Sequence, residues 1–519
     1  MVAVRGLFVN AMKTMRTHKT VFFLFATSAL IAKAVASQDF EQNIEKTFQA
    51  RSGGQLILEA DRGSVEVKTD QSDKVQVHVF RKVSGGSKAN ADEQFANHEV
   101  TLTQEGNKVL VVAKNKTNKH FSWSINRPGM EVHYVINIPK KFDVELKTAG
   151  GNIQLADLDG EAMARTSSGS IKVGHVSGKV ELSDAGGNIY VTEAGQGVAA
   201  KTSSGSVEVD KAEGTVEISD AGGNIRVTEA NGNVVANTSS GSVKIGAAKG
   251  DLEIKNAGGD ITIESTEGGV KASTSSGSIR VGSAKGARVF LRDAGGNIEV
   301  GEVGGDVSAE TSSGSIKINS AEGAVMAKDA GGDVILGNIG GELSAQTSSG
   351  SVKVKGAKGK IEIKDSGGNV VVDEAGADAN ISTSSGTIKV GTIAGKLEAK
   401  NSGGSVEIGS ARDAVAVRTS SGNISVNFAN SPESDSRLEV SGGGIKVGLP
   451  RTAGIDLDAQ ASGGQVSSAL PVATIVQGEQ PRTGLKGKIN GGGAALVLRS
   501  SSGDIRLTES PTQQAEAEK

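Results

Sequence analysis

The chain has no cysteine among its 519 residues. This absence excludes disulfide bonds, thiolate metal sites and the lipid-modified cysteine of a bacterial lipoprotein. Aromatic residues make up only 3% of the sequence, with one tryptophan, so large aromatic side chains cannot dominate the core. An excess of one charge is missing too, because 56 basic and 59 acidic residues nearly cancel. That balance argues against a nucleic-acid partner held by bulk positive charge.

Recognisable motifs for catalysis or metal binding are also lacking. A repeated acid such as Asp184 could act as a base, but a catalytic group seldom occurs in several copies along a chain. The Asp-x-Gly-Gly-Asn segments lack the Gly-x-Gly-x-Asp spacing of calcium-binding repeats. No metal-ligand spacing is found among the histidines of the expected mature chain, which are His78, His98, His120, His133 and His175. The sequence therefore predicts no catalytic, cofactor-binding or metal-binding residues.

The first 36 residues have the pattern of an export signal. Basic residues at 13, 16 and 19 precede an apolar run over 21–31, and Ala34-Val35-Ala36 has the small-x-small form of a cleavage site. The run is shorter than the roughly 20 residues that span a bilayer. We expect a mature chain that begins near Ser37 and lies outside the cytoplasm. The alternative is an uncleaved membrane anchor.

Glycine, by contrast, is abundant, and its spacing is regular. The chain has 72 glycines, and one recurs every 18 residues from Gly151 to Gly422. A single step, from Gly277 to Gly296, is 19 residues long. A short fixed period indicates stacked coils, in which each unit buries its apolar side against its neighbours.

Apolar residues keep fixed positions within each period. Counted from the repeat glycine they fall at +2, +4, +7, +11 and +13, and the second coil has Ile171, Val173, Val176, Val180 and Leu182 there. Two pairs spaced by two residues predict two short strands, with the residue at +7 in the bend between them. β-Branched residues favour strand over helix. The sequence thus predicts an all-β protein, a parallel β-solenoid with about 18 residues per coil.

Two kinds of coil alternate, so that the full sequence repeat is 36 residues. One kind has Thr-Ser-Ser-Gly-Ser at its corner, at 166–170, 202–206, 238–242, 274–278, 311–315 and 347–351. The other has Asp-Ala-Gly-Gly-Asn at 184–188, 220–224 and 293–297, or the related Asp-Ser-Gly-Gly-Asn at 365–369. Alignment stacks threonine on aspartate along one edge. We expect this column to form hydrogen bonds from coil to coil.

The outward positions also form rows. Position +3 of the serine-type coils is mostly basic, with Lys172, Glu208, Lys244, Arg280, Lys317, Lys353 and Lys389. Position +12 of the same coils is mostly acidic, with Glu181, Glu217, Glu253, Phe290, Met326, Glu362 and Glu398. We interpret the charged rows as solvated faces. Phe290 and Met326 interrupt the acidic row close to the 19-residue step, which predicts a small exposed apolar patch and a contact site.

The pattern divides the chain into five parts. They are a signal peptide (1–36), an N-terminal capping β region (37–148), the regular solenoid (149–428), C-terminal β coils with a cap (429–508) and a disordered tail (509–519). Polar segments from Ser84 to Asn97 and from Asn115 to Gly129 are expected as surface loops. The less regular coils at both ends would act as caps that protect the terminal sheet edges.

Several segments resemble one known family. They are Gly63-Ser64-Val65-Glu66-Val67, Tyr134-x-Ile136-x-Ile138-Pro139, the Thr-Ser-Ser-Gly-Ser coils, Asn490-Gly491-Gly492-Gly493 and Gly503-Asp504-Ile505. The chain resembles the bacterial family of exported β-strand-repeat proteins catalogued as adhesins, whose molecular function is largely unassigned. The resemblance covers most of the mature chain and implies an exported bacterial β-solenoid, but it supplies no catalytic residues to transfer.

Length, repeat and signal together predict an exported, non-enzymatic protein of the bacterial cell envelope, adhesin-like or structural. Its expected partner is a protein or polysaccharide of the envelope or surface, and its expected location is the periplasm, the cell surface or the medium. Two alternatives stay open: a secreted carbohydrate-active β-helix enzyme, and a scaffold for an envelope assembly.

Overall fold

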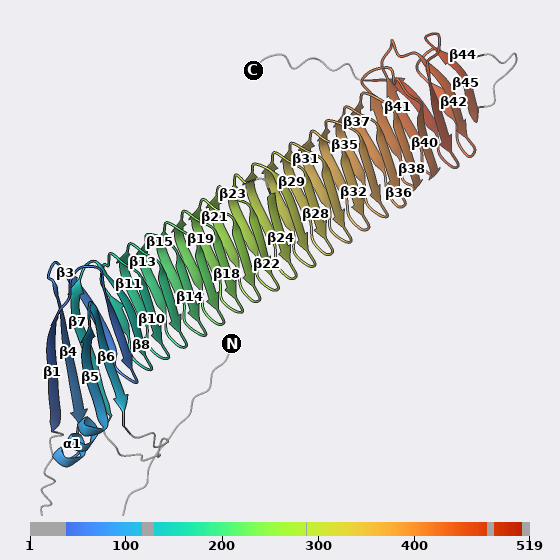
Figure 1. Ribbon diagram of the computed structural model, residues 1–519. Coiled ribbons are helices and arrows are strands. Elements are labelled where there is room, and N and C mark those ends of the chain that lie inside the picture. The colour runs from blue at the N-terminus through green and yellow to red at the C-terminus, as the bar shows by residue number, and fades with distance from the viewer. Residues whose placement is uncertain (1–37, 117–128, 287, 475–481, 511–519) are drawn as a thin grey trace, which may run out of the picture.

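In the computed structural model, residues 38–116, 129–286, 288–474 and 482–510 are described. They form 47 strands and one short helix, stacked into a long rod (Figure 1). Within the regular part a new coil begins about every 18 residues, and its strands pair in parallel with those of the next coil. The predicted parallel β-solenoid is therefore confirmed. The predicted signal peptide and residues 511–519 of the predicted tail lie outside the described ranges.

Each coil contributes one strand to each of two facing sheets. The regular strands of the first, called sheet A, are β9 (Ile153–Leu155), β11 (Ile171–Val176), β13 (Ile189–Ala194), β15 (Val207–Ala212), β17 (Ile225–Ala230), β19 (Val243–Ala248), β21 (Ile261–Thr266), β23 (Ile279–Ala284), β25 (Ile298–Val303), β27 (Ile316–Ala321), β29 (Val334–Ile339), β31 (Val352–Ala357), β33 (Val370–Ala375), β35 (Ile388–Ile393), β37 (Val406–Ala411) and β39 (Ile424–Phe428).

The regular strands of the second sheet, called sheet B, alternate with these along the chain. They are β8 (Phe142–Thr148), β10 (Ala162–Thr166), β12 (Val180–Asp184), β14 (Val198–Thr202), β16 (Val216–Asp220), β18 (Val234–Thr238), β20 (Leu252–Asn256), β22 (Val270–Thr274), β24 (Arg288–Asp293), β26 (Asp306–Thr311), β28 (Val325–Asp329), β30 (Leu343–Thr347), β32 (Ile361–Asp365), β34 (Ala379–Thr383), β36 (Leu397–Asn401) and β38 (Val415–Ser421).

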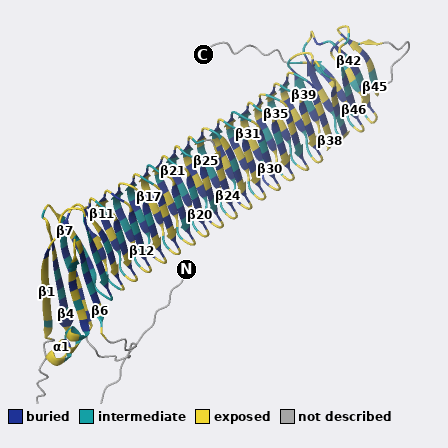
Figure 2. Ribbon diagram, viewed as in Figure 1, coloured by how far each residue is buried: buried dark blue, intermediate teal, exposed yellow. Residues whose placement is uncertain are grey.

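The interior is built as the periodicity predicts. Buried residues alternate along the strands of sheet B and occupy +2, +4 and +7 in the strands of sheet A, and Figure 2 shows the resulting stripes of buried and exposed positions along the rod. Val180, at +11, is fully buried and pairs in register with Ala162 and Val198 of the neighbouring coils. Burying a side chain of this size stabilises the fold by roughly 1.5–3 kcal/mol.

One local prediction is wrong. The residue at +7 does not lie in the bend: Val176 ends β11, whose six residues run from +2 to +7. Between +4 and +7 the inward alternation skips two residues, and Gly174 has no partner in the ladder between β11 and β13. This irregularity lets one strand keep three inward side chains, at +2, +4 and +7. Thr266, the polar residue at +7, donates from Oγ1 to the carbonyl oxygen of Gly250 at 3.1 Å.

Close packing of the backbone explains the 18-residue glycine period. A Cβ atom added to Gly187 would lie 1.8 Å from the carbonyl oxygen of Gly169, the equivalent glycine of the preceding coil. Gly205 stands against Gly187 in the same way, with 1.7 Å. Real Cβ atoms do not approach a backbone oxygen so closely, so each coil must have glycine at this corner to stack on the one before it.

The N-terminal cap departs from the parallel pattern. It contains β1 (Asp39–Gln49), β2 (Gly54–Ala60), β3 (Ser64–Asp70), β4 (Lys74–Ser84), α1 (Lys88–Asn97), β5 (His98–Glu105), β6 (Lys108–Asn115) and β7 (Met130–Pro139). β4 pairs antiparallel with both β1 and β7, and β5 pairs antiparallel with β6. The predicted loop from Ser84 to Asn97 is wrong in part, because it contains α1. Ser87 caps that helix by accepting a hydrogen bond from the Asn90 amide at 3.3 Å.

The C-terminal end is also capped by antiparallel strands. Its elements are β40 (Ser436–Gly442), β41 (Ile445–Leu449), β42 (Ile455–Ala461), β43 (Val466–Ser468), β44 (Ala473–Thr474), β45 (Gly484–Ile489), β46 (Ala494–Ser500) and β47 (Ile505–Glu509). β46 lies between β40 and β42 in sheet B, and β45 pairs antiparallel with β42. This reversal ends the parallel ladder, as a terminal cap must.

Deleting one 36-residue repeat, residues 368–403, is expected to give a shorter but folded rod. The deletion removes β33 to β36 and joins Gly367 directly to Gly404. Gly404 then takes the place of Gly368 at the corner, so the column of corner glycines continues. Each coil contacts only its neighbours, so the others are unaffected. Solution scattering of the monomeric chain should show a loss of length of about 10 Å, the rise of two coils. Loss of the β circular dichroism signal would contradict the stacked-coil fold.

Candidate interaction surface

The repeated acids at position +15 are structural. Asp184 is buried, and its Oδ1 and Oδ2 accept hydrogen bonds from the amides of Gly186 and Gly187 at 3.1 and 2.8 Å. In the next coil Thr202 donates from Oγ1 to the carbonyl oxygen of Gly187 at 3.4 Å. The predicted coil-to-coil hydrogen bonding is thus confirmed, but the column points inward. Asp184 is thus buried and bound to the turn amides, so its carboxylate holds the corner and does not face solvent.

The neighbouring edge forms a second ladder on the surface. Asn188 accepts from the Ser206 amide through Oδ1 at 2.8 Å, and Ser206 accepts from the Asn224 amide through Oγ at 3.3 Å. Each side chain therefore satisfies an amide of the following coil. These residues hold the corners in register.

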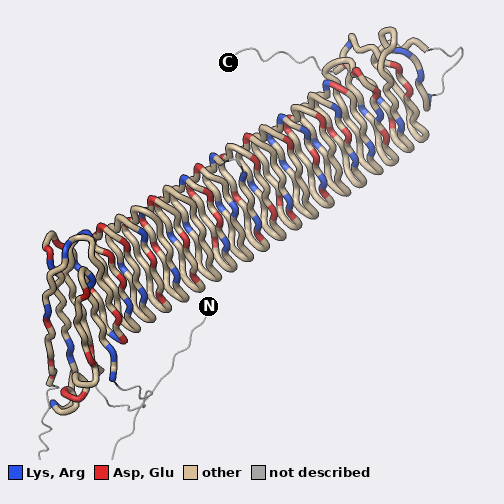
Figure 3. Tube along the Cα trace, in the orientation of Figure 1, with Lys and Arg blue, Asp and Glu red and all other residues tan. Residues whose placement is uncertain are grey.

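Basic and acidic residues are interspersed along the whole rod (Figure 3). Much of the basic row of sheet A is neutralised between coils: Arg280 lies 2.8 Å from Glu299, and Lys244 lies 2.7 Å from Glu264. Exposed pairs of this kind each contribute little to stability, about 0–1 kcal/mol. The row therefore presents a mixed surface with no strong field of one sign.

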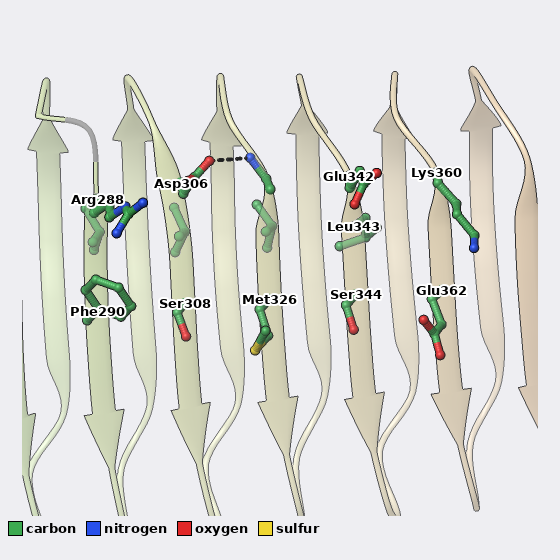
Figure 4. Close-up of a pocket in the computed structure, with 14 residues that line it drawn as sticks. Arg288, Phe290, Asp306, Ser308, Met326, Glu342, Leu343, Ser344, Lys360 and Glu362 are labelled. Carbon is green, nitrogen blue, oxygen red and sulfur yellow. Dashed lines mark hydrogen bonds between the residues drawn. The ribbon is translucent and has the colours of Figure 1, made fainter.

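Sheet B carries the predicted apolar patch on its outer face. Phe290 of β24 and Met326 of β28 are 49% and 45% exposed. Ser308 of β26 lies between them, and Ser344 of β30 follows Met326. Figure 4 shows Phe290, Ser308, Met326, Ser344 and Glu362 in one row across five adjacent strands. The prediction of an exposed patch is confirmed.

Shallow depressions adjoin this patch. One, of about 390 Å³, extends from Phe290 past Met326 to Glu362, and another, of about 530 Å³, lies between Phe290 and Glu253. A third depression, of about 380 Å³, lies nearer the N-terminus over Ala199 and Val235. Large and small outward side chains thus alternate on this face of sheet B.

Position +10 forms a charged rim beside the patch. Arg288, Asp306, Glu342 and Lys360 lie in a second row next to the apolar one (Figure 4). Asp306 accepts a hydrogen bond from the Ala324 amide at 2.9 Å. Within the described residues, Arg288, Glu342 and Lys360 form no ion pair inside the chain. Their charges are therefore available to a partner.

The histidines of the described residues lie in separate parts of the molecule and do not form one cluster. His175 is exposed, with Nδ1 3.0 Å from Asp157 and Nε2 3.6 Å from Glu193. Hydrogen bonds from the backbone and side chain of His175 lower the pKa of Asp157. His120 lies outside the described ranges. In the part of the chain that the structure describes, no group of three or more histidine, aspartate or glutamate side chains could hold a metal ion.

A buried polar cluster in the N-terminal cap was not predicted. Arg81 donates to the carbonyl oxygen of Phe95 at 3.0 Å, and its Nη1 lies 3.5 Å from Nδ1 of the buried His98. Nε2 of His98 lies 3.5 Å from Oδ1 of Asp61. Burial raises the pKa of Tyr134 beside them. These residues join β4, β5 and β7, and the sequence gives no periodic signal that could have revealed them.

Two facing parallel sheets built from 18-residue coils define a β-solenoid repeat protein. The chain belongs to the Toastrack DUF4097 family, whose model matches residues 55–285 and again residues 247–427. The family resemblance inferred from the sequence motifs is thereby confirmed. None of the curated proteins compared with the chain matches it. Among the described residues no helix could cross a membrane.

Three solved structures show similarity to this chain. A "putative adhesin" from Bacteroides fragilis is 16% identical, with 46% of this chain and 96% of that one covered and a TM-score of 0.25. A "putative cell adhesion protein" from Clostridium sporogenes is 9% identical, with coverages of 90% and 100% and a TM-score of 0.14. A "putative adhesin" from Parabacteroides distasonis is 11% identical, with coverages of 67% and 97% and a TM-score of 0.13.

Proposed function

We propose that this protein is an exported, non-enzymatic β-solenoid of the bacterial cell envelope, adhesin-like or structural, whose contact surface is the outer face of sheet B. One observation carries the proposal. On the outer face of sheet B, Phe290 and Met326 expose apolar surface beside Arg288, Glu342 and Lys360, which form no ion pair within the described residues. Exposed apolar residues rimmed by polar ones are typical of contact sites on proteins.

The leader sequence supports export. Its basic residues, short apolar run and small-x-small segment are typical of a secretory signal. The names of the three similar structures refer to adhesion, which agrees with a role at the cell surface. A polysaccharide-cleaving β-helix is the alternative, but the repeated corner aspartates do not support it, because a carboxylate such as that of Asp184 is buried and bound to turn amides.

Capture of envelope material by the immobilised full-length chain tests the proposal. The wild-type chain should retain an envelope component, and Phe290→Ser should reduce that retention about tenfold, the effect of losing one central apolar contact. Ile335→Ser is the matched control, because Ile335 is 42% exposed and lies on sheet A. Equal retention by all three chains would contradict the proposed surface. A periplasmic or surface location should follow from fractionation of the producing cells.

A further inference from the structure

The outer face of sheet B has large and small apolar side chains at matching distances. At position +12, Ala199 of β14 and Val235 of β18 are half-buried and lie in a depression, whereas Phe290 and Met326 protrude. Two coils separate Ala199 from Val235, and two coils separate Phe290 from Met326. The two recesses and the two projections therefore have the same spacing, about 10 Å.

We infer that this face binds a second copy of the chain, with the two rods running in opposite directions. The two copies are related by a two-fold axis that is parallel to the strands and lies between β20 and β22. The inference rests on the contact role proposed above and names the occupant. With that axis, Phe290 of one copy lies opposite Val235 of the other, and Met326 lies opposite Ala199. One face then supplies both halves of the contact, as a two-fold interface requires.

Charges at the centre of this arrangement agree with the same axis. Glu253 of β20 and Lys271 of β22 lie on either side of it, so each faces the opposite charge of the second copy. Within one chain the two already form an ion pair, with 3.3 Å between Lys271 Nζ and Glu253 Oε1. Antiparallel pairing therefore produces a group of four alternating charges. A parallel pairing would place Glu253 against Glu253 and Lys271 against Lys271.

The charged rim at position +10 matches as well. Glu161 faces Lys360 of the second copy, and Lys179 faces Glu342. Of these four residues, only Lys179 has an ion-pair partner within the described part of its own chain: Glu181, at 2.7 Å. Like charges meet only in the row at +14, where Lys201 approaches Lys328 and Arg165 approaches Lys364 of the second copy. Long side chains at a rim can turn outward into solvent, so this row costs little.

The area of the face is sufficient for a stable dimer. The matched region covers twelve strands, from β10 to β32 of sheet B, so at about 4.8 Å per strand it is roughly 58 Å long. Five residues of strand add a width of roughly 17 Å. The product is about 990 Å² on each copy, compared with the ~800 Å² per partner of a typical stable interface.

Sedimentation of the purified full-length chain tests the inference. Wild-type protein should form dimers, and Phe290→Ser should raise the dimer dissociation constant at least about tenfold. Ile335→Ser, on the other sheet, should leave it unchanged within about twofold. Lys360→Glu should weaken the dimer, and Lys360→Glu combined with Glu161→Lys should restore it. A dimer insensitive to Phe290→Ser would overturn the inference.

Cross-linking determines the orientation. Because the chain has no cysteine, Glu217→Cys and Ser308→Cys each introduce one unique thiol and leave Phe290 and Met326 in place. With the proposed axis, Glu217 of β16 lies opposite Ser308 of β26, so a short bismaleimide should link a Glu217→Cys copy to a Ser308→Cys copy in a mixture. It should fail to link two Ser308→Cys copies, whose substituted residues would be about 24 Å apart along the rod, the rise of five coils. Efficient linkage of Ser308→Cys to itself would indicate parallel pairing and overturn the proposed axis.

The two proposals can fail separately. A chain that stays monomeric, while its capture of envelope material still depends on Phe290, would exclude a second copy as the occupant and leave the contact role intact. A monomeric chain whose capture ignores Phe290 would contradict both.

Discussion

Val180→Asp is expected to destabilise the solenoid by about 4 kcal/mol or more, the range of a buried charge without a partner. Val180 is fully buried at +11 of its coil, and its partners along sheet B are Ala162 and Val198. None of these side chains can donate a hydrogen bond to a carboxylate. The carboxylate would have to remain desolvated between three coils, take up a proton and stay there as an unpartnered acid, or be released by local unfolding of β12.

Thermal and chemical denaturation followed by circular dichroism would measure this loss. Limited proteolysis should show new cleavage near β12, because neighbouring coils of a repeat protein can open locally. Ser168→Ala is the control from the exposed corner of the adjacent coil, and it should cost less than about 1 kcal/mol, since water replaces the lost hydroxyl partner. The reverse order of the two effects would mean that every strand is shifted by one residue, with its inward and outward faces exchanged.

Gly187→Ala is expected to be almost as severe, at about 3 kcal/mol or more, which lies at the upper end of overpacking effects. The added methyl group would lie 1.8 Å from the carbonyl oxygen of Gly169 and 2.4 Å from its carbonyl carbon. Backbone atoms cannot move aside as the end of a side chain can. Relief therefore requires the two coils to separate at the corner, which lengthens the ladder hydrogen bonds next to it.

The preceding residue provides the matched control. At Gly186 an added Cβ would have its nearest neighbour, the carbonyl oxygen of Ser167, at 3.6 Å, an ordinary contact distance. Gly186→Ala should therefore change the free energy of unfolding by less than about 1 kcal/mol. Melting curves of the two variants compare the same substitution at adjacent positions. Equal destabilisation would show that backbone freedom, not the contact with Gly169, is the reason for glycine at 187.

The repeat made most of the fold predictable. Position +11 is apolar in coil after coil, so the inward assignment of Val180 rests on many equivalent positions. Phe290 and Met326 stood out for the same reason, because they depart from an otherwise acidic row. Asp184 shows the limit of this reasoning. An aspartate suggests an exposed corner, but the turn that follows it offers two amides, and these allow its carboxylate to be buried.

The caps were less predictable because their sequences do not repeat. Nothing in the spacing of residues 39–115 indicates that β4 runs antiparallel between β1 and β7, or that Arg81 and His98 meet in the interior. Such contacts join segments that are distant along the chain. The polar composition of residues 88–97 was consistent with a loop, yet they form a capped helix.

By itself, the sequence determined the coil length, the two strands per coil and the inward positions, because a strict 18-residue period permits only a stack in which equivalent residues meet. Tertiary structure decided the rest. It placed the +7 residue within the strand, turned the Asp184 column inward, and set β4 of the N-terminal cap antiparallel to β1 and β7. These features depend on which surfaces and backbone groups come into contact in the folded chain. A periodic sequence shows only which residues occupy the same position in successive coils, so it could not reveal these contacts.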